Sequence, residues 1–377
     1  MVYLDYSATT PLNKEVLESF NKVCIEYPGN ANSLHKLGRD TYHLMEAATK
    51  QVADLLKVDS KEVIFTSGAS ESNNLAIIGT ALKYKNRGNH ILTTKLEHSS
   101  VLETVNHLEK NGFEVEYIKL LKNGKIDLND LKNKIKETTI LVSINHVNSE
   151  IGIIQDVNEI GSILKEYPKI VFHVDGTQAV GKIKVNLDNI DLYSFSSHKI
   201  YGIKGVGCLI KKRHIELMPI IHGGKSQTIY RSGTPSVPLY VSLAKALKLA
   251  LGDFDNKYNH VLELNKYLKK NLETMKLVHI NSNEECVPHI LNLSIRGIKP
   301  ETMMHALAEY DIYISTKTAC ANDDSLSLAV YEVTMDKELA KNSIRISLSS
   351  LTTYEEIDYF LKIFKEKINE LSIELGE

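Results

Sequence analysis

The residues best suited to chemistry in this chain surround Lys199, which lies between a hydroxyl-rich segment and several glycines. Asp191 to Phe195 is strand-like, so we expect the Lys199 amine just past the carboxyl end of a strand, where α/β folds place their chemistry. Gly202, Gly205 and Gly207 keep this region uncrowded. An amine in this position can form a Schiff base, although a lysine beside glycines is more often a solvated loop residue.

A second segment has the features of a phosphate-binding turn. Val63 to Ser67 is strand-like, Gly68 to Ser70 is a turn of small residues, and Glu71 to Tyr84 has helical spacing of its apolar residues. Free N–H groups at a helix N-terminus and the positive end of its dipole favour an anion, and the serine hydroxyls add donors. Ordinary helix capping is the alternative interpretation.

Asp175 ends the apolar run Ile170 to Val174 and is followed by Thr177 and Gln178. A carboxylate at a strand end can keep the ring nitrogen of pyridoxal phosphate protonated, which that cofactor needs in order to act as an electron sink. A helix N-cap would also explain an aspartate here. Together with the lysine and the phosphate-binding turn, Asp175 favours a pyridoxal phosphate site.

Eight segments follow one another along the chain: LDYSATTP at 4–11, TSGASESNNLAI at 66–77, EHSSVL at 97–102, HVNSEIG at 146–152, HVDGTQAVGK at 173–182, SFSSHKIYGIKGVG at 194–207, RSGT at 231–234 and SIRISLS at 343–349. In this order they resemble the signature segments of class V aminotransferase-fold cysteine desulfurases of the NifS/IscS type. The resemblance covers essentially the whole chain. It implies an α/β fold of the fold type I pyridoxal phosphate transferases, with a large domain built on a mostly parallel sheet, a smaller α+β domain, and a homodimer.

The resemblance also implies roles for individual residues. Lys199 would hold the cofactor aldehyde, Asp175 would pair with the pyridinium, and Gln178 would bond the phenolate oxygen. His98 would stack on the ring and assist proton transfers. Arg345 would grip the substrate carboxylate with its planar fork, although taken alone it would be assigned to a surface ion pair. The other cofactor-binding residues implied are Ala69, Ser70, Ser196 and His198 at the phosphate, Thr234 from a second subunit, and Ser149 near the ring oxygen.

The four cysteines form no CxxC pair, which argues against a zinc site or a disulfide framework. Cys24 and Cys208 lie in helical and apolar stretches, and we expect both to be buried. Cys320 lies in the polar stretch STKTACANDDSLS, where a free thiol can reach an active site and carry a group away. The resemblance implies that Cys320 takes the substrate sulfur and becomes a persulfide.

Three positions depart from the family pattern. The usual SSGSAC reads STKTAC, so Lys317 replaces a glycine and adds a charge that favours the Cys320 thiolate. Ser149 replaces an asparagine that contacts the ring oxygen, so that hydrogen bond is lost or bridged by water. Ala31 replaces a proline and affects loop stiffness more than chemistry.

The reaction implied by the resemblance converts L-cysteine to L-alanine and leaves a persulfide on Cys320, with Lys199 moving the α-proton. A selenocysteine lyase would use the same frame, a class V transaminase would not need Cys320, and a chain that had lost catalysis could be a scaffold for sulfur-carrier proteins. The sulfur acceptor is left open among iron–sulfur scaffolds, tRNA-thiolation enzymes and thiamine synthesis. The TAC loop and ISLSSLTT loosely resemble the forms dedicated to tRNA thiolation.

Composition agrees with an intracellular enzyme. The 45 basic and 47 acidic residues nearly balance, so strong attraction to nucleic acid is not expected. Lys211 to Arg213 could guide a partner, although a solvated face is the simpler interpretation. We expect a cytoplasmic protein, because no signal peptide is recognisable and no apolar run approaches the ~20 residues that span a bilayer.

Strand-like runs at 90–94, 114–118, 140–144, 170–174, 191–195 and 206–210 alternate with helical stretches. This alternation predicts a mostly parallel sheet covered on both faces. A long helical stretch from about Ser236 to Glu273 is expected to leave the large domain. The expected domains are a large cofactor-binding domain at 16–254 and a small domain at 255–377 that carries the cysteine loop, with residues 1–15 packing on the small domain.

Overall fold

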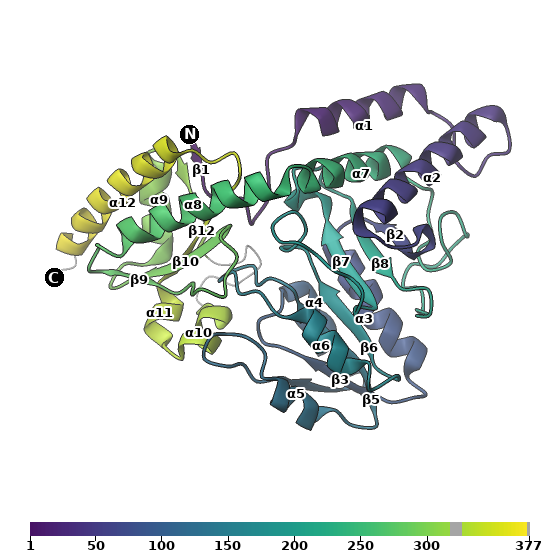
Figure 1. Cartoon of the computed structure of the whole chain (residues 1–377), viewed down its shortest axis with the longest axis horizontal. Coiled ribbons are helices and arrows are strands. Elements are labelled where there is room, and N and C mark those ends of the chain that lie inside the picture. The colour runs from purple at the N-terminus through teal and green to yellow at the C-terminus, as the bar shows by residue number, and fades with distance from the viewer. Residues whose placement is uncertain (317–325, 375–377) are drawn as a thin grey trace.

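The computed structural model describes residues 1–316 and 326–374. These residues form two lobes that lie side by side (Figure 1). The larger lobe is built on a seven-stranded sheet with the order β2-β8-β7-β6-β5-β3-β4. Its strands are β2 (Val63–Thr66), β3 (His90–Thr93), β4 (Glu114–Tyr117), β5 (Thr139–Asn145), β6 (Val171–Asp175), β7 (Leu192–Ser196) and β8 (Gly207–Lys211). β8 runs antiparallel to β2 and β7, and the other neighbouring strands are parallel, which confirms the mostly parallel sheet.

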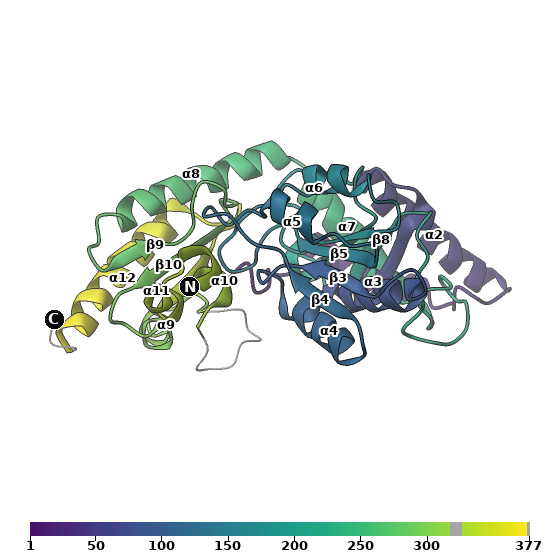
Figure 2. The ribbon, with the colours of Figure 1, turned by 90° about the horizontal axis from the view of Figure 1, so that it is seen from below.

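Both faces of the large sheet are buried. Successive strand residues enter different hydrophobic cores: Ile64 and Leu141 belong to one, and Phe65 and Val142 to the other. Because side chains alternate across a strand, such runs are apolar throughout. Helices α3 (Ala69–Tyr84) and α4 (Ser99–Lys110) cover one face, and α1 (Lys14–Glu26), α2 (Lys36–Leu56), α5 (Leu128–Lys134), α6 (Val157–Leu164) and α7 (Val237–Leu251) supply the core on the other. Figure 2 shows the sheet between α6 and α7 on one side and α3 and α4 on the other.

The long helical stretch expected from 236 to 273 is two helices, which corrects the sequence-based prediction. α7 ends at Leu251, Gly252 takes an extended conformation with ψ 137°, and Asp253 is left-handed with φ 54°. The chain then restarts as α8 (Phe254–Leu272), which enters the smaller lobe. Glycine has a low helix propensity, so little free energy is lost when Gly252 leaves the helix, and this allows the break.

The smaller lobe has an antiparallel sheet in the order β12-β10-β9 and a two-stranded parallel pair, β1 with β11. Its hydrophobic core also includes Val2 and Leu4 from the N-terminus. The division into domains at residues 15/16 and 254/255 remains our proposal. The elements of this lobe are β1 (Val2–Tyr3), α8, β9 (Val278–Ile280), β10 (Ile290–Ile295), α9 (Pro300–Ala308), β11 (Ile312–Tyr313), α10 (Leu328–Thr334), α11 (Lys337–Lys341), β12 (Ser343–Ser347) and α12 (Tyr354–Glu374).

The segment after β1 joins the two lobes at the end of β7. The N–H and the hydroxyl of Thr10 both donate to the carbonyl of His198, at 3.0 and 2.9 Å, and the Tyr201 N–H donates to the Thr10 hydroxyl at 2.7 Å. The chain between Val2 and Thr10 is therefore anchored at one end in the small lobe and at the other beside Lys199.

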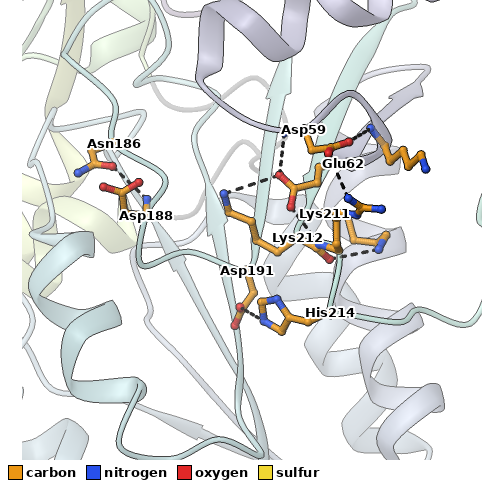
Figure 3. Close-up of polar contacts among 10 residues, drawn as sticks. Asp59, Glu62, Asn186, Asp188, Asp191, Lys211, Lys212 and His214 are labelled. Atoms are coloured by element: carbon orange, nitrogen blue, oxygen red, sulfur yellow. Dashed lines mark hydrogen bonds and ion pairs between the residues drawn. The ribbon is translucent and has the colours of Figure 1, made fainter.

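A separate polar cluster lies at the other end of these strands, where β2 and β7 begin and β8 ends (Figure 3). Arg213 pairs with Asp59 at 3.3 Å and Lys212 approaches Glu62 at 3.8 Å, while buried Lys211 donates to the Ile215 carbonyl. The basic run at 211–213 therefore faces carboxylates and backbone of its own chain. No helix in residues 1–316 or 326–374 combines the length and apolar character needed to cross a membrane.

Candidate active site

A cavity of about 570 Å³ lies where the carboxyl ends of β2, β3, β5, β6 and β7 meet. In α/β sheets this edge is where ligands bind. Ten of the residues predicted from the sequence line it: Ala69, Ser70, His98, Ser149, Asp175, Gln178, Ser196, His198, Lys199 and Arg345. Thr234 is exposed in the single chain and is not among the described lining residues. Cys320 and Lys317 lie outside the described residues.

Lys199 ends a short 3₁₀ turn, η2 (Ser197–Lys199), directly after β7. Its ammonium donates to the carbonyls of Ser7 and Ala8, at 2.5 and 2.7 Å. The turn is tightly packed, because a Cβ at Gly202 would lie 1.9 Å from the Ser197 hydroxyl oxygen. The glycine is thus needed for the close approach that places the amine against the N-terminal segment.

The N-terminus of α3 forms the opposite end of the cavity. Gly68 is its N-cap, and no described side chain caps its N–H groups, so they are available to an anion. Gly207 of β8 has no room for a side chain, since a Cβ there would lie 2.6 Å from the Gly68 backbone. The glycine in β8 therefore leaves space for the backbone of the turn at Gly68.

A partly buried ion pair supports the same turn. The Glu71 carboxylate accepts the Ser67 N–H at 2.7 Å and pairs with Arg231 at 2.9 Å. Burial alone would raise the pKa of Glu71, but the hydrogen bonds from Arg231 and Ser67 bring it below its ordinary value. Arg231 opens the RSGT motif, and its role could not be read from the sequence. The ion pair with Glu71 explains why a positively charged residue occupies position 231.

Asp175 is held by contacts to both carboxylate oxygens. Oδ1 accepts the N–H of Thr177 at 3.0 Å and its hydroxyl at 2.5 Å, which closes a local turn. Oδ2 accepts the side-chain amide of Asn73 at 2.8 Å. Asn73 was missed by sequence reasoning. The available signal was a polar residue on the face of α3 that also buries Ala76 and Ile77.

His98 is the N-cap of α4. Its Nδ1 accepts the Ser100 N–H at 3.1 Å, so in the neutral ring the proton lies on Nε2. Burial lowers the pKa of His98 and outweighs the opposing effect of Asp175. A neutral imidazole at this position can stack on an aromatic ring and exchange a proton.

His198 is half-buried, and this partial burial, with Lys199 and Lys204 nearby, lowers its pKa to about 4. Its Nδ1 lies 3.2 Å from the Thr9 hydroxyl. His198 therefore enters the site as a neutral hydrogen-bonding group.

Arg345 reaches the cavity from β12 of the small lobe. Only 2 % of its surface is exposed, so it is not a surface ion-pair former. One guanidinium nitrogen donates to Asp5 at 2.9 Å, another donates to the Ser149 carbonyl at 2.8 Å, and Nε has no partner among the described residues. A buried guanidinium with spare N–H capacity suits a carboxylate ligand.

The cysteines differ in part from the sequence-based prediction. Cys208 is buried, as expected, and burial raises the pKa of its thiol. Cys24 is exposed, which corrects the expectation of burial. It follows buried Val23 on α1, and a step of one residue turns the side chain about 100° around a helix, away from the core. Burial raises the pKa of Cys286 to about 11, so its thiol stays protonated at neutral pH.

One group of metal-ligand side chains lies elsewhere in the described residues. Atoms of His90, Glu114 and Glu116 lie within 4.8 Å of one another near the starts of β3 and β4. The Lys136 ammonium contacts both carboxylates, at 2.6 Å for Glu114 and closer for Glu116. Lys136 thus supplies the cation that these two carboxylates require.

The donors around the large cavity fit pyridoxal phosphate. The uncapped N-terminus of α3 suits a phosphate group, the Lys199 amine suits an aldehyde, and the Asp175 carboxylate suits a pyridine nitrogen. Each group is held by neighbouring protein atoms before any ligand arrives, which favours binding of a rigid planar cofactor.

Comparison with known proteins identifies the family. The class V aminotransferase model matches residues 2–360. The chain is 42% identical to the cysteine desulfurase IscS of Buchnera aphidicola subsp. Baizongia pistaciae, over 98% of this chain and 93% of that one. It is also 42% identical to a NifS/IcsS protein homolog of Lactobacillus delbrueckii subsp. bulgaricus, over 98% and 100%.

Two solved structures agree with this result. A NifS-like protein superposes with a TM-score of 0.92 at 35% identity, covering 98% of this chain and 99% of that chain. A structure described as SspA in complex with cysteine superposes with a TM-score of 0.82 at 31% identity, covering 94% and 100%. The chain therefore belongs to the class V aminotransferase family.

Proposed function

We propose that this chain is a pyridoxal phosphate-dependent cysteine desulfurase. The observation that carries the proposal is one cavity lined by the Lys199 amine, the Asp175 carboxylate and the Arg345 guanidinium. These are the groups needed to hold the cofactor and an amino acid carboxylate together. The full-length relatives named cysteine desulfurase and the related structure with cysteine support L-cysteine as the substrate.

When bound, pyridoxal phosphate supplies an electron sink for the bonds at the substrate α-carbon. Asp175, oriented by Asn73, keeps the ring nitrogen protonated. Lys199 accepts the α-proton and returns a proton to the product, and neutral His98 assists. Arg345 holds the carboxylate, so that the β-carbon and its sulfur are presented in one orientation.

Sulfur leaves the substrate by attack of the Cys320 thiolate. A sulfur–sulfur bond forms while the carbon–sulfur bond breaks, and the electron pair of that bond stays on the β-carbon. The carbon is therefore reduced and, after protonation, becomes the methyl group of L-alanine, while the transferred sulfur is oxidised to the persulfide level. Among the described cysteines, Cys208 and Cys286 are poor candidates because burial keeps them protonated.

The proposal includes a homodimer, in which Thr234 of each subunit reaches the phosphate site of the other. The exposure of Thr234 in the single chain supports this arrangement. The persulfide would pass to a sulfur-acceptor protein, either a tRNA-thiolation enzyme or an iron–sulfur scaffold. A cytoplasmic location, expected from the sequence, is part of the same proposal.

Mass spectrometry after brief exposure to L-cysteine tests the proposal. We expect one extra sulfur on the peptide that contains Cys320, and alanine in solution. Cys320→Ser should still bind L-cysteine and change the cofactor absorbance, but sulfide release should fall to background. Cys24→Ser is the matched control because Cys24 is an exposed thiol, and it should retain full activity. Extra sulfur on Cys24, Cys208 or Cys286, or undiminished alanine formation by Cys320→Ser, would refute the mechanism.

A further inference from the structure

Lys182 lies behind the wall of the cofactor cavity, in a second cavity of about 190 Å³ that shares Lys199 with the first. The side chain is buried, and no carboxylate is among the described residues that line this second cavity. Burial, with Lys199 and Arg345 nearby, lowers the pKa of Lys182 to about 7. Keeping a lysine here is costly, so its position calls for a specific use.

The Lys182 ammonium donates to the Oε1 atom of Gln178. The other end of the same amide, Nε2, donates to the Ser7 carbonyl at 2.9 Å. Ser7 and Gln178 both line the cofactor cavity, and the Ser7 carbonyl also accepts from Lys199. A continuous set of hydrogen bonds therefore runs from Lys182 through Gln178 and Ser7 to Lys199.

These two contacts determine which way the Gln178 amide faces. A backbone carbonyl can only accept, so the amide nitrogen faces Ser7, and in its ammonium form Lys182 can only donate, so the amide oxygen faces Lys182. A flipped amide would set its oxygen against the Ser7 carbonyl and its N–H₂ against the ammonium, and both contacts would be repulsive. Lys182 and Ser7 thus hold the Gln178 amide in the same orientation from its two ends.

We propose that Lys182 is a positioning residue that holds the Gln178 amide with its nitrogen toward the cofactor cavity, where it donates to the phenolate oxygen of pyridoxal phosphate. Without Lys182, the amide can rotate and present its oxygen to that phenolate, which repels it. The inference rests on the proposed function, because it uses the cofactor and the role of Gln178, but it concerns a residue outside the cofactor cavity.

The test is a double-mutant cycle on the cofactor-loaded enzyme. Lys182→Met should shift the absorbance maximum of the bound cofactor and the pH midpoint of its titration, and it should lower kcat/KM for L-cysteine about tenfold. In a Gln178→Ala background, the same Lys182→Met change should add no further shift and no further loss. Additive effects, or an unshifted absorbance in Lys182→Met, would overturn the inference.

The matched control is Lys257→Met. Lys257 lines the same second cavity, but its ammonium bonds the Leu249 and Gly252 carbonyls, both at 2.6 Å, and does not contact Gln178. This variant should keep the wild-type absorbance and pH midpoint. An equal shift in Lys257→Met would mean that any lysine of the cavity acts through general charge, and the inference would fail.

Two more variants keep the test decisive if Lys182→Met does not fold. Lys182→Arg retains an obligate donor and should give the wild-type absorbance, whereas Lys182→Gln can accept as well as donate and should shift it. Identical spectra for these two variants would contradict the inference. Failure of the proposed function would be seen separately, as a wild-type protein that forms no alanine from L-cysteine.

Discussion

The side-chain amide of Asn73 donates to Oδ2 of Asp175 across 2.8 Å, and this bond links α3, whose N-terminus is the proposed phosphate site, with the carboxylate at the end of β6. Asn73 also donates to the Ser100 hydroxyl at 2.9 Å, and that hydroxyl lies 2.9 Å from Nδ1 of His98. The groups proposed for the phosphate, the ring nitrogen and the ring face are therefore coupled through one buried amide.

Asp175→Ala should reduce catalysis more than it reduces cofactor retention. In the proposed site the carboxylate keeps the ring nitrogen charged, while the N-terminus of α3 and the neighbouring hydroxyls supply most of the binding energy for the phosphate. We expect kcat to fall by at least about 100-fold. Asn73→Ala should cause a smaller fall, since it leaves Asp175 in place but less well oriented. Steady-state kinetics and a cofactor-binding titration of both variants check this, and wild-type turnover in Asp175→Ala would remove the residue from its proposed role.

Lys199→Ala should prevent sodium borohydride from fixing the cofactor covalently to the protein. Lys199 is the lysine whose amine is held at the carboxyl end of β7 by two backbone carbonyls. Lys204 also lines the cavity, so Lys204→Ala is the control and should still be labelled. Mass spectrometry of the reduced protein makes the measurement. A labelled Lys199→Ala variant would contradict the assignment.

Arg345→Lys should raise the KM for L-cysteine at least about tenfold, with a smaller effect on kcat. A lysine keeps the charge but loses the fork that can bond Asp5, the Ser149 carbonyl and a substrate carboxylate at once. Arg296 is exposed, and Arg296→Lys should leave both constants unchanged. An unchanged KM in Arg345→Lys would show that the substrate carboxylate is held elsewhere.

Ser149→Asn should leave activity the same or increase it. Arg345 bonds the backbone carbonyl of Ser149, so the substitution keeps that contact while restoring the amide that is usual in the family. Turnover of L-cysteine and the cofactor absorbance of the variant should be measured together. A large loss of turnover would indicate that this chain has built a different contact at position 149.

Glu97→Gln should stabilise the protein increasingly as pH rises. Burial raises the pKa of Glu97 from the ordinary 4.5 to about 8, against the hydrogen bonds from Thr94 and Asn145. Between these pH values the folded protein holds the proton more tightly than the unfolded chain does, so the wild type loses stability as pH rises through this window. The free energy of unfolding of Glu97→Gln should exceed that of the wild type by on the order of 2 kcal/mol at pH 8.

Urea denaturation at several pH values between 5 and about 8 measures this difference. Glu103 lies on the exposed side of α4, so Glu103→Gln should show no such pH-dependent gain. A difference between Glu97→Gln and the wild type that is independent of pH would show that Glu97 is already ionised in the folded protein.

Local patterns were enough to predict much of the fold. The strands of the large sheet were predicted to within one residue at each end. Such runs are apolar because both faces of the sheet are buried, so a short window of sequence carries the signal. The same local reasoning failed at Gly252, because a helix break of two residues depends on where the next helix must pack.

The motif residues at strand ends were predictable because parallel strands bring their carboxyl ends to one edge, which places Lys199, Asp175 and His98 together. Their partners come from distant segments, and only the tertiary structure decides them. The sequence alone determined the family, the order of the elements and the groups that are proposed to react. Packing decided that Arg345 is buried, that Cys24 is exposed and that Lys182 reaches Gln178, because burial and hydrogen-bond partners depend on which surfaces meet after the chain has folded.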